Sequence, residues 1–168
     1  MTIFSPPALP GGGYQIDKSL RFRASGSTYL TRTPSSTGNR QTYTLSIWVK
    51  RGDLGAVRGL WGAYSSTTST AYLYFTSADT LLFADITGSV DINVSTSSVF
   101  RDPSAWYHLT LEVDTADATA TNRVKLWVNG VQQTLTFTTT PAQYTNTSVN
   151  VSAVPNYLGR ITNNVPTT

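Results

Sequence analysis

The residues best suited to hold a ligand are aromatic side chains placed opposite the aliphatic positions of their segments. They are Trp48, Tyr72, Tyr74 and Trp127. Sugar rings pack their C–H faces against aromatic rings, and their hydroxyl groups bond to amide and carboxylate side chains. The pattern therefore indicates a glycan-binding surface. The alternative is that these rings cover the second face of a sheet or an oligomer interface.

Groups that could carry out catalysis are sparse. Glu112 is the only glutamate, and the next acid on its side of the segment is Asp114, at the segment's end. A retaining glycosidase needs two carboxyl groups about 5 Å apart, one as nucleophile and one as acid. His108 is the only histidine, no Gly-x-Ser-x-Gly elbow is present, and the absence of cysteine leaves zinc without its usual ligands. We predict that the protein is not an enzyme and binds no such metal, and a glycosidase is only a third hypothesis.

Two neighbouring segments, 106–113 and 123–131, organise the chain. Apolar residues occupy every second position in both, as in a strand with one buried face, and Asn129-Gly130 tolerates the positive φ of a tight hairpin turn. A single helical turn is expected at 100–104 and a loop at 114–122, and Trp61 and Trp106 are expected in the core. Further strands are predicted at 19–23, 27–32, 43–50, 60–64 with a bulge or close backbone approach, 71–75, 81–86, 90–94, 131–138, 148–152 and 156–161.

Many short strands separated by glycine, proline and asparagine turns, without an internal repeat, predict two packed antiparallel sheets. A chain of 168 residues can bury a substantial core as one domain. The net charge is +3, but the basic residues are scattered, with no run beyond Lys50-Arg51, which argues against nucleic-acid binding. No apolar run approaches membrane-spanning length, so we expect no membrane insertion.

Residues 1–16 are rich in proline and glycine, which disfavours both helix and interior strand. We therefore predict an extended arm over 1–16 and a jelly-roll β-sandwich over 17–168. The arm is either a disordered tail or a segment that becomes ordered by docking on a partner. Its anchoring residues would be Phe4, Pro6, Pro7, Leu9, Tyr14 and Ile16.

The order of these motifs resembles the laminin-G-like, or concanavalin A-like, jelly rolls, over most of residues 18–161. The family pattern is a strand with an aromatic residue and histidine, a loop, and a strand that ends in Asn-Gly. More narrowly, several runs are similar to fibre and appendage proteins of tailed bacteriophages. The matching segments are Ser19-Leu20-Arg21-Phe22, Tyr43-Thr44-Leu45-Ser46-Ile47-Trp48-Val49-Lys50, Trp106-Tyr107-His108-Leu109, Val124-Lys125-Leu126-Trp127-Val128-Asn129-Gly130 and Tyr157-Leu158-Gly159-Arg160-Ile161.

The resemblance implies a noncatalytic structural or receptor-binding module of a virion, in a tail or head fibre. Its arm would attach to other virion proteins, its sandwich would meet a host-surface glycan, and it would assemble as a trimer. The alternative is a capsid-decorating, or cement, protein that binds no glycan.

Two further expectations come from this resemblance. Laminin-G-like domains often bind calcium at a rim, and Asp53, Asp85, Asp91 and Asp117 lie in or near expected loops, although without a recognisable metal-binding spacing. We favour ordinary turn caps and no cofactor, with calcium as the alternative. The family's closing Gly-x-hydrophobic-Asp-x-hydrophobic strand is also missing after residue 161. We expect a fragment of a longer fibre, ahead of a strand that is dispensable or supplied by a neighbour.

Overall fold

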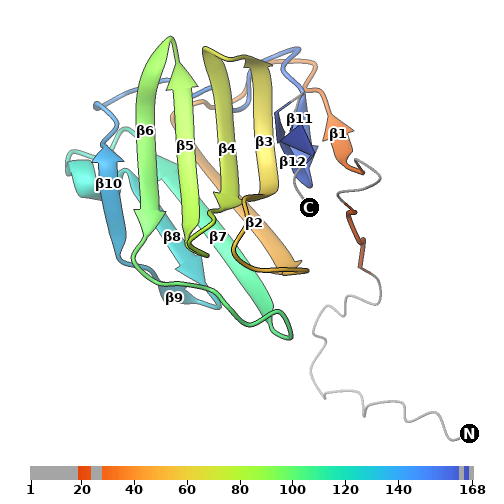
Figure 1. The fold of residues 1–168 in the computed structure, drawn as a ribbon. Coiled ribbons are helices and arrows are strands. Elements are labelled where there is room, and N and C mark those ends of the chain that lie inside the picture. Colours follow the sequence, from red (N-terminus) through yellow and green to blue (C-terminus); the bar gives the residue numbers. More distant parts are fainter. Residues whose placement is uncertain (1–18, 24–27, 163–164, 167–168) are drawn as a thin grey trace, which may run out of the picture.

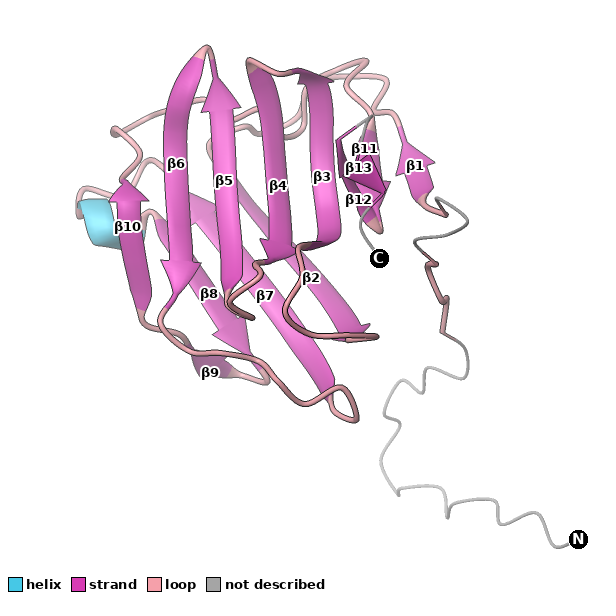
Figure 2. Cartoon of the chain, in the orientation of Figure 1, coloured by secondary structure: helices cyan, strands magenta, loops and turns pink. Residues whose placement is uncertain are grey.

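The fold consists of two antiparallel sheets that pack against each other around one core (Figures 1 and 2). The computed structural model describes residues 19–23, 28–162 and 165–166. In spatial order, the larger sheet contains β1 (Leu30–Arg32), β11 (Asn156–Leu158), β3 (Arg58–Ser66), β4 (Ser69–Phe75), β5 (Leu81–Thr87), β6 (Ser89–Thr96) and β10 (Leu135–Thr139). The smaller sheet contains β2 (Thr42–Lys50), β7 (Trp106–Asp114), β8 (Val124–Val128) and β9 (Val131–Gln132). The predicted all-β jelly-roll sandwich is confirmed.

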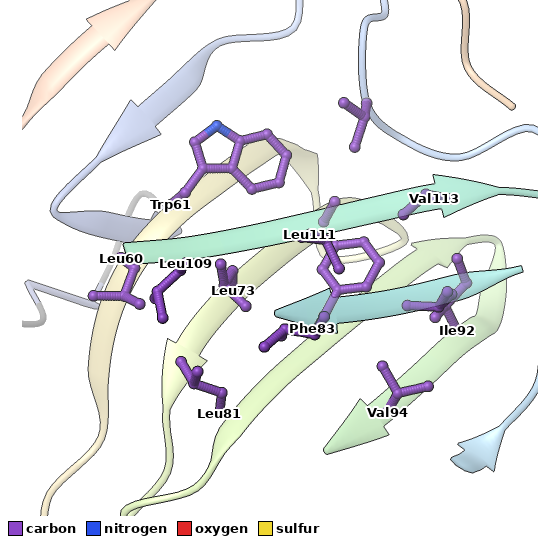
Figure 3. Close-up of a cluster of buried hydrophobic side chains, with 14 of the residues drawn as sticks. Leu60, Trp61, Leu73, Leu81, Phe83, Ile92, Val94, Leu109, Leu111 and Val113 are labelled. Atoms are coloured by element: carbon purple, nitrogen blue, oxygen red, sulfur yellow. The ribbon is translucent and has the colours of Figure 1, made fainter. Parts of the chain in front are cut away.

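The core is built from side chains that alternate along the strands of both sheets. Figure 3 shows Leu109 and Leu111 of β7 among Leu73, Phe83 and Ile92 of the larger sheet. All five side chains are almost fully buried. Because successive strand residues point to opposite faces, the apolar alternation read from the sequence decides which face of each sheet is inside.

Three predicted elements are wrong. The described residues 19–23 form no strand, 100–104 contains no helical turn, and 148–152 forms a turn. In the last case the backbone bonds to the chain around residues 34–40, since the Gly38 N–H donates to the Asn150 carbonyl at 2.9 Å and Ala153 N–H to the Pro34 carbonyl at 2.9 Å. Near residue 100, the carbonyl of Phe100 accepts a hydrogen bond from the buried guanidinium of Arg51. In these two segments, hydrogen bonds to distant parts of the chain are present in place of the predicted helical turn and strand.

Two predicted strands are each divided between sheets. Residues 131–138 give β9 in the smaller sheet and β10 in the larger one. Residues 156–161 give β11 and then β12 (Arg160–Thr162), which pairs with β13 (Val165–Pro166) in a separate two-stranded sheet. Gly159 separates β11 from β12 with a φ of +77°, a conformation that glycine adopts without strain. The predicted Asn129-Gly130 turn is confirmed, with φ angles of 51° and 78°.

The β12 strand lies on the outer face of the larger sheet, over β3. A Cβ atom at Gly62 would come within 2.6 Å of the Ile161 carbonyl oxygen. Trp61 and Ala63, on either side of Gly62, point into the core, so the close approach is on the opposite face. The β3–β4 register also shifts between Gly59 and Trp61. The predicted bulge and close backbone approach in this strand are both present.

The loop 114–122 contains one short 3₁₀ turn, η2 (Ala120–Asn122). Within the described part of the chain, no helix is long and apolar enough to cross a membrane.

A buried carboxylate ties the loop around residue 148 to β5. The carboxylate of Asp85 accepts hydrogen bonds from the Ser148 N–H at 2.9 and 3.1 Å and from the Thr87 hydroxyl at 3.2 Å. The side chain has no exposed surface. Burial disfavours the charged form and raises the pKa of Asp85 to about 7, although these hydrogen bonds act to lower it.

Replacing Leu126 with aspartate should prevent folding. Leu126 is buried between the sheets, so the substitution places an unpaired charge in the core, at a cost above about 4 kcal/mol. The matched control is Thr136→Asp, at an exposed position of β10. Circular dichroism should show a cooperative melting transition for the control and none for Leu126→Asp. A soluble, folded Leu126→Asp protein would contradict the strand register.

Asp85→Asn should reduce the pH dependence of stability. Folded Asp85 keeps its proton up to about pH 7, whereas an unfolded aspartate loses it near pH 3.8. The folded state therefore binds more protons in this window, and its stability falls as pH rises through it. Urea midpoints should show the wild type losing about 2–3 kcal/mol more than Asp85→Asn between pH 5 and pH 8. Equal losses in the two proteins would show that the carboxyl group is not protonated in the fold.

Candidate functional site

The outer face of the smaller sheet carries three tryptophans. On β7, the inward direction of Leu109 and Leu111 turns the residues between and before them outward. The same alternation turns outward one tryptophan on β2 and another on β8. We define the tryptophan face as Trp48, Trp106, His108, Thr110 and Trp127.

The strand register brings these side chains into cross-strand contact. Trp48 lies directly opposite His108, and Thr110 lies directly opposite Trp127. Trp106 occupies the position diagonal to Trp48, at a distance of about 7–8 Å that long aromatic side chains can span. Trp127 is two strands from Trp48, about 10 Å across the sheet. The three tryptophans are therefore spread over three neighbouring strands of the smaller sheet.

Trp48 is held by a ring stack and a hydrogen-bonded histidine. The Trp48 and His108 rings are stacked, with centroids 4.8 Å apart and planes 24° apart. The hydroxyl of Ser46 lies 2.8 Å from Nε2 of His108, where either group can donate according to the histidine tautomer. The backbone N–H of His108 donates to Oδ1 of Asn129 at 2.8 Å, which joins this strand position to the Asn-Gly turn. Trp48 therefore rests on a fixed neighbour, so little of its freedom is left to lose on binding.

Trp106 is a candidate binding residue that the sequence interpretation placed in the core. Its side chain is 46% exposed, compared with 55% for Trp48 and 7% for Trp61, which does lie in the core. The prediction for Trp106 was wrong because the alternation that buries Tyr107 turns its predecessor outward. Its shared parity with His108 was the signal that could have found it. Trp127 is half-buried.

The structure does not bring the four predicted glycan-binding residues together. Tyr72 and Tyr74 lie on β4, where the alternate residue Leu73 points into the core, so their rings face outward from the larger sheet. Their ring centroids are 5.7 Å apart, and both side chains are half-buried. Partial burial raises the pKa of each hydroxyl. The tyrosine pair and the tryptophan face are on opposite surfaces of the sandwich.

The carboxylates of the smaller sheet are already engaged. Glu112 accepts a hydrogen bond from the ammonium group of Lys125 at 3.2 Å. Asp114 accepts one from the Thr42 hydroxyl at 3.2 Å and another from the Ala116 N–H at 3.1 Å. Neither group is arranged as a free nucleophile beside a protonated acid.

The aspartates considered for calcium bind groups of the protein. Asp53 forms an ion pair with Arg58, which lowers its pKa. Asp91 accepts a hydrogen bond from the Thr87 N–H at 3.0 Å, and Asp117 accepts one from the Thr119 N–H at 2.7 Å. Over the described residues, no group of three or more histidine, cysteine, aspartate or glutamate side chains could hold a metal ion. The absence of a cofactor, with calcium as the alternative, stays a prediction.

The predicted anchoring residues of the arm lie outside the described residues. They are Phe4, Pro6, Pro7, Leu9, Tyr14 and Ile16.

Comparison with solved structures gives two similar folds. A native heptameric SAP-like pentraxin from Limulus polyphemus matches with a TM-score of 0.54 and 15% identity, over 82% of this chain and 59% of that one. Domains LG4-5 of the mouse laminin alpha1 chain match with a TM-score of 0.60 and 15% identity, over 88% of this chain and 37% of that one. The chain thus spans about three fifths of the pentraxin and less than half of the laminin chain.

No curated protein sequence matches the chain. A family model does match, over residues 24–164, which is most of the chain. By this match, the chain belongs to the concanavalin A-like lectin/glucanases superfamily, in its laminin-G group.

Proposed function

We propose that the protein is a noncatalytic carbohydrate-binding module and that the tryptophan face is its binding surface. The observation that carries the proposal is the set of three outward tryptophans on one four-stranded sheet, of which Trp48 and Trp106 are about half exposed. Exposed apolar patches on a protein surface commonly mark a site that a ligand or a partner covers.

The polar groups between the rings suit sugar hydroxyls. Ser46, His108 and Thr110 lie beside or between the tryptophans and can donate or accept hydrogen bonds. The rings supply apolar contact to the C–H faces of a sugar, and the polar groups fix its orientation. The membership in a superfamily that contains lectins supports the same proposal.

The absence of catalysis is part of the proposal, because the same superfamily contains glucanases. Support comes from the ion pair of Glu112 with Lys125 and from the lack of a second glutamate. A retaining mechanism would need two carboxyl groups of different protonation about 5 Å apart.

We further propose a virion fibre as the setting, attached to other virion proteins through residues 1–16 and assembled as a trimer on a host-surface glycan. This part rests on the sequence resemblance alone. A capsid-decorating protein that binds no glycan is the competing proposal, and it predicts that the tryptophan face is covered by a protein neighbour.

Trp48→Ala and Trp106→Ala should each weaken glycan binding at least tenfold, because each removes a ring from the tryptophan face. A glycan array identifies the ligand, and titration calorimetry then gives the dissociation constant for each variant. The controls are Tyr72→Ala and Tyr74→Ala, on the opposite surface, which should bind as the wild type does. If the tyrosine variants lose binding and the tryptophan variants keep it, the site is on the larger sheet. If the array shows no ligand, the decorating role replaces the glycan-binding one.

The glycan bound on the array should not be hydrolysed. Incubation of the wild type and of Glu112→Gln with this glycan should release no reducing sugar from either protein, because the chain has no second catalytic carboxyl group beside Glu112. Release by the wild type that disappears in Glu112→Gln would make the protein a glycosidase.

A further inference from the structure

The outer edge of β2 presents backbone groups that no described strand pairs. β2 is the first strand of the smaller sheet, and its partner is β7. The Thr115 N–H donates to the Gln41 carbonyl at 2.9 Å, which fixes the alternation of hydrogen-bonded pairs along these strands. By that alternation, the N–H and carbonyl groups of Thr44, Ser46 and Trp48 point away from β7. They form a template for one more strand.

The larger sheet extends past this edge, and the described strands of the smaller sheet leave part of its inner face uncovered. Leu158 pairs with Trp61 on one side and with Leu30 on the other, so all three side chains face the smaller sheet. Trp61 is 7% exposed, whereas Leu158 is 37% and Leu30 is 47% exposed. The exposure rises where the smaller sheet stops at β2, since β11 and β1 lie beyond it at the end of the larger sheet (Figure 1).

A pocket marks the inner side of the same edge. It has a volume of about 160 Å³ and lies between β2, β3, β11 and the turn at 148–152. The lining residues are Tyr43, Thr44, Leu45, Trp61, Val149, Asn150 and Asn156. The inward side chains of β2 are only half-buried, whereas their counterparts on β7 are buried. The sandwich therefore has room for apolar side chains next to β2.

We infer that this edge accepts a single extended strand of another polypeptide, which pairs with β2 and covers Leu30 and Leu158. Main-chain hydrogen bonds to Thr44, Ser46 and Trp48 would give affinity, and alternate apolar side chains would enter the space under the larger sheet. This inference is independent of the glycan proposal.

The extension of β11 and β1 past β2 favours a single incoming strand over a second copy of the sandwich. If two copies paired through their β2 edges, the β11 and β1 strands of each copy would need the space occupied by those of the other. One strand without a second layer above it meets no such obstacle.

The charge at the edge indicates one feature of the incoming strand. Arg32 on β1 lies opposite Asn156, which lines the pocket, so its side chain also faces the uncovered region. Arg32 is exposed, and no carboxylate of the described residues forms an ion pair with it. A strand of alternating apolar residues with a carboxylate near one end would complement both the apolar surface and this cation.

The test uses the whole chain and a designed probe. The probe is a nine-residue synthetic peptide of alternating valine and threonine with one terminal valine replaced by aspartate. The control peptide has the same composition in blocks, without alternation. Amide hydrogen exchange followed by NMR should show that the alternating peptide slows exchange at Thr44, Ser46 and Trp48 at least tenfold. The amides of Tyr43, Leu45 and Ile47, which point to β7, should change little.

Two matched variants locate the contact. Thr44→Pro removes an outward N–H that bonds to no described residue, and an edge strand tolerates such a proline. Peptide affinity should therefore fall at least tenfold. Thr44→Val keeps the N–H and should bind like the wild type. Leu30→Asp, at an exposed position, should also weaken peptide binding. It replaces Thr44→Pro in the test if the proline variant does not fold.

Three results would overturn the inference. The first is no slowing of exchange at millimolar peptide. The second is equal binding of the control peptide or of Thr44→Pro. The third is slow exchange of the Thr44, Ser46 and Trp48 amides before peptide is added, which would mean that the chain's own residues, in a monomer, or a second copy, in a dimer, already fill the edge.

Discussion

The alternation of side chains along β7 is the constraint on which the rest of the structure depends. Tyr107, Leu109, Leu111 and Val113 are all buried against the larger sheet, and burial of these four side chains is a major part of what holds the layers together. Because successive side chains of a strand point to opposite faces, Trp106 and His108 must then point outward. The tryptophan face is thus a consequence of core packing. A shift of register by one residue would bury the tryptophans and expose the core.

A second constraint acts at the end of the sandwich, where a buried ion pair lies beside buried aromatic rings. The Arg51 guanidinium bonds to Asp79 at 2.9 Å, lies 4.3 Å from the centroid of the Phe75 ring, and also binds the Phe100 carbonyl. Asp79 accepts a further hydrogen bond from the Gly55 N–H at 2.8 Å, and its pKa is lowered to about 2. This cluster joins the end of β2 to the β4–β5 turn and to the segment before β7. It lies against the apolar core, since Phe75 and Phe100 both belong to the core cluster.

The sequence predicts those parts of the fold that local periodicity determines. The strands β4, β5, β7 and β8 and the Asn129-Gly130 turn follow from a period of two and from glycine and asparagine chemistry. The segment 148–152 and the division of 131–138 do not follow, because long-range hydrogen bonds and a change of sheet decide them. For the candidate site, periodicity identifies Trp48 and Trp127. It does not reveal that Tyr72 and Tyr74 lie on the opposite surface, since parity defines a face only within one sheet.

The strand β2 contributes to both of the proposed binding surfaces. The side chain of Trp48 lies on the tryptophan face, stacked on His108, while its backbone N–H points to the unpaired edge. Among the described strands, only β7 pairs with β2, so the backbone of β2 is held by a neighbouring strand on one side. A strand added at the edge would restrict the backbone that positions Trp48.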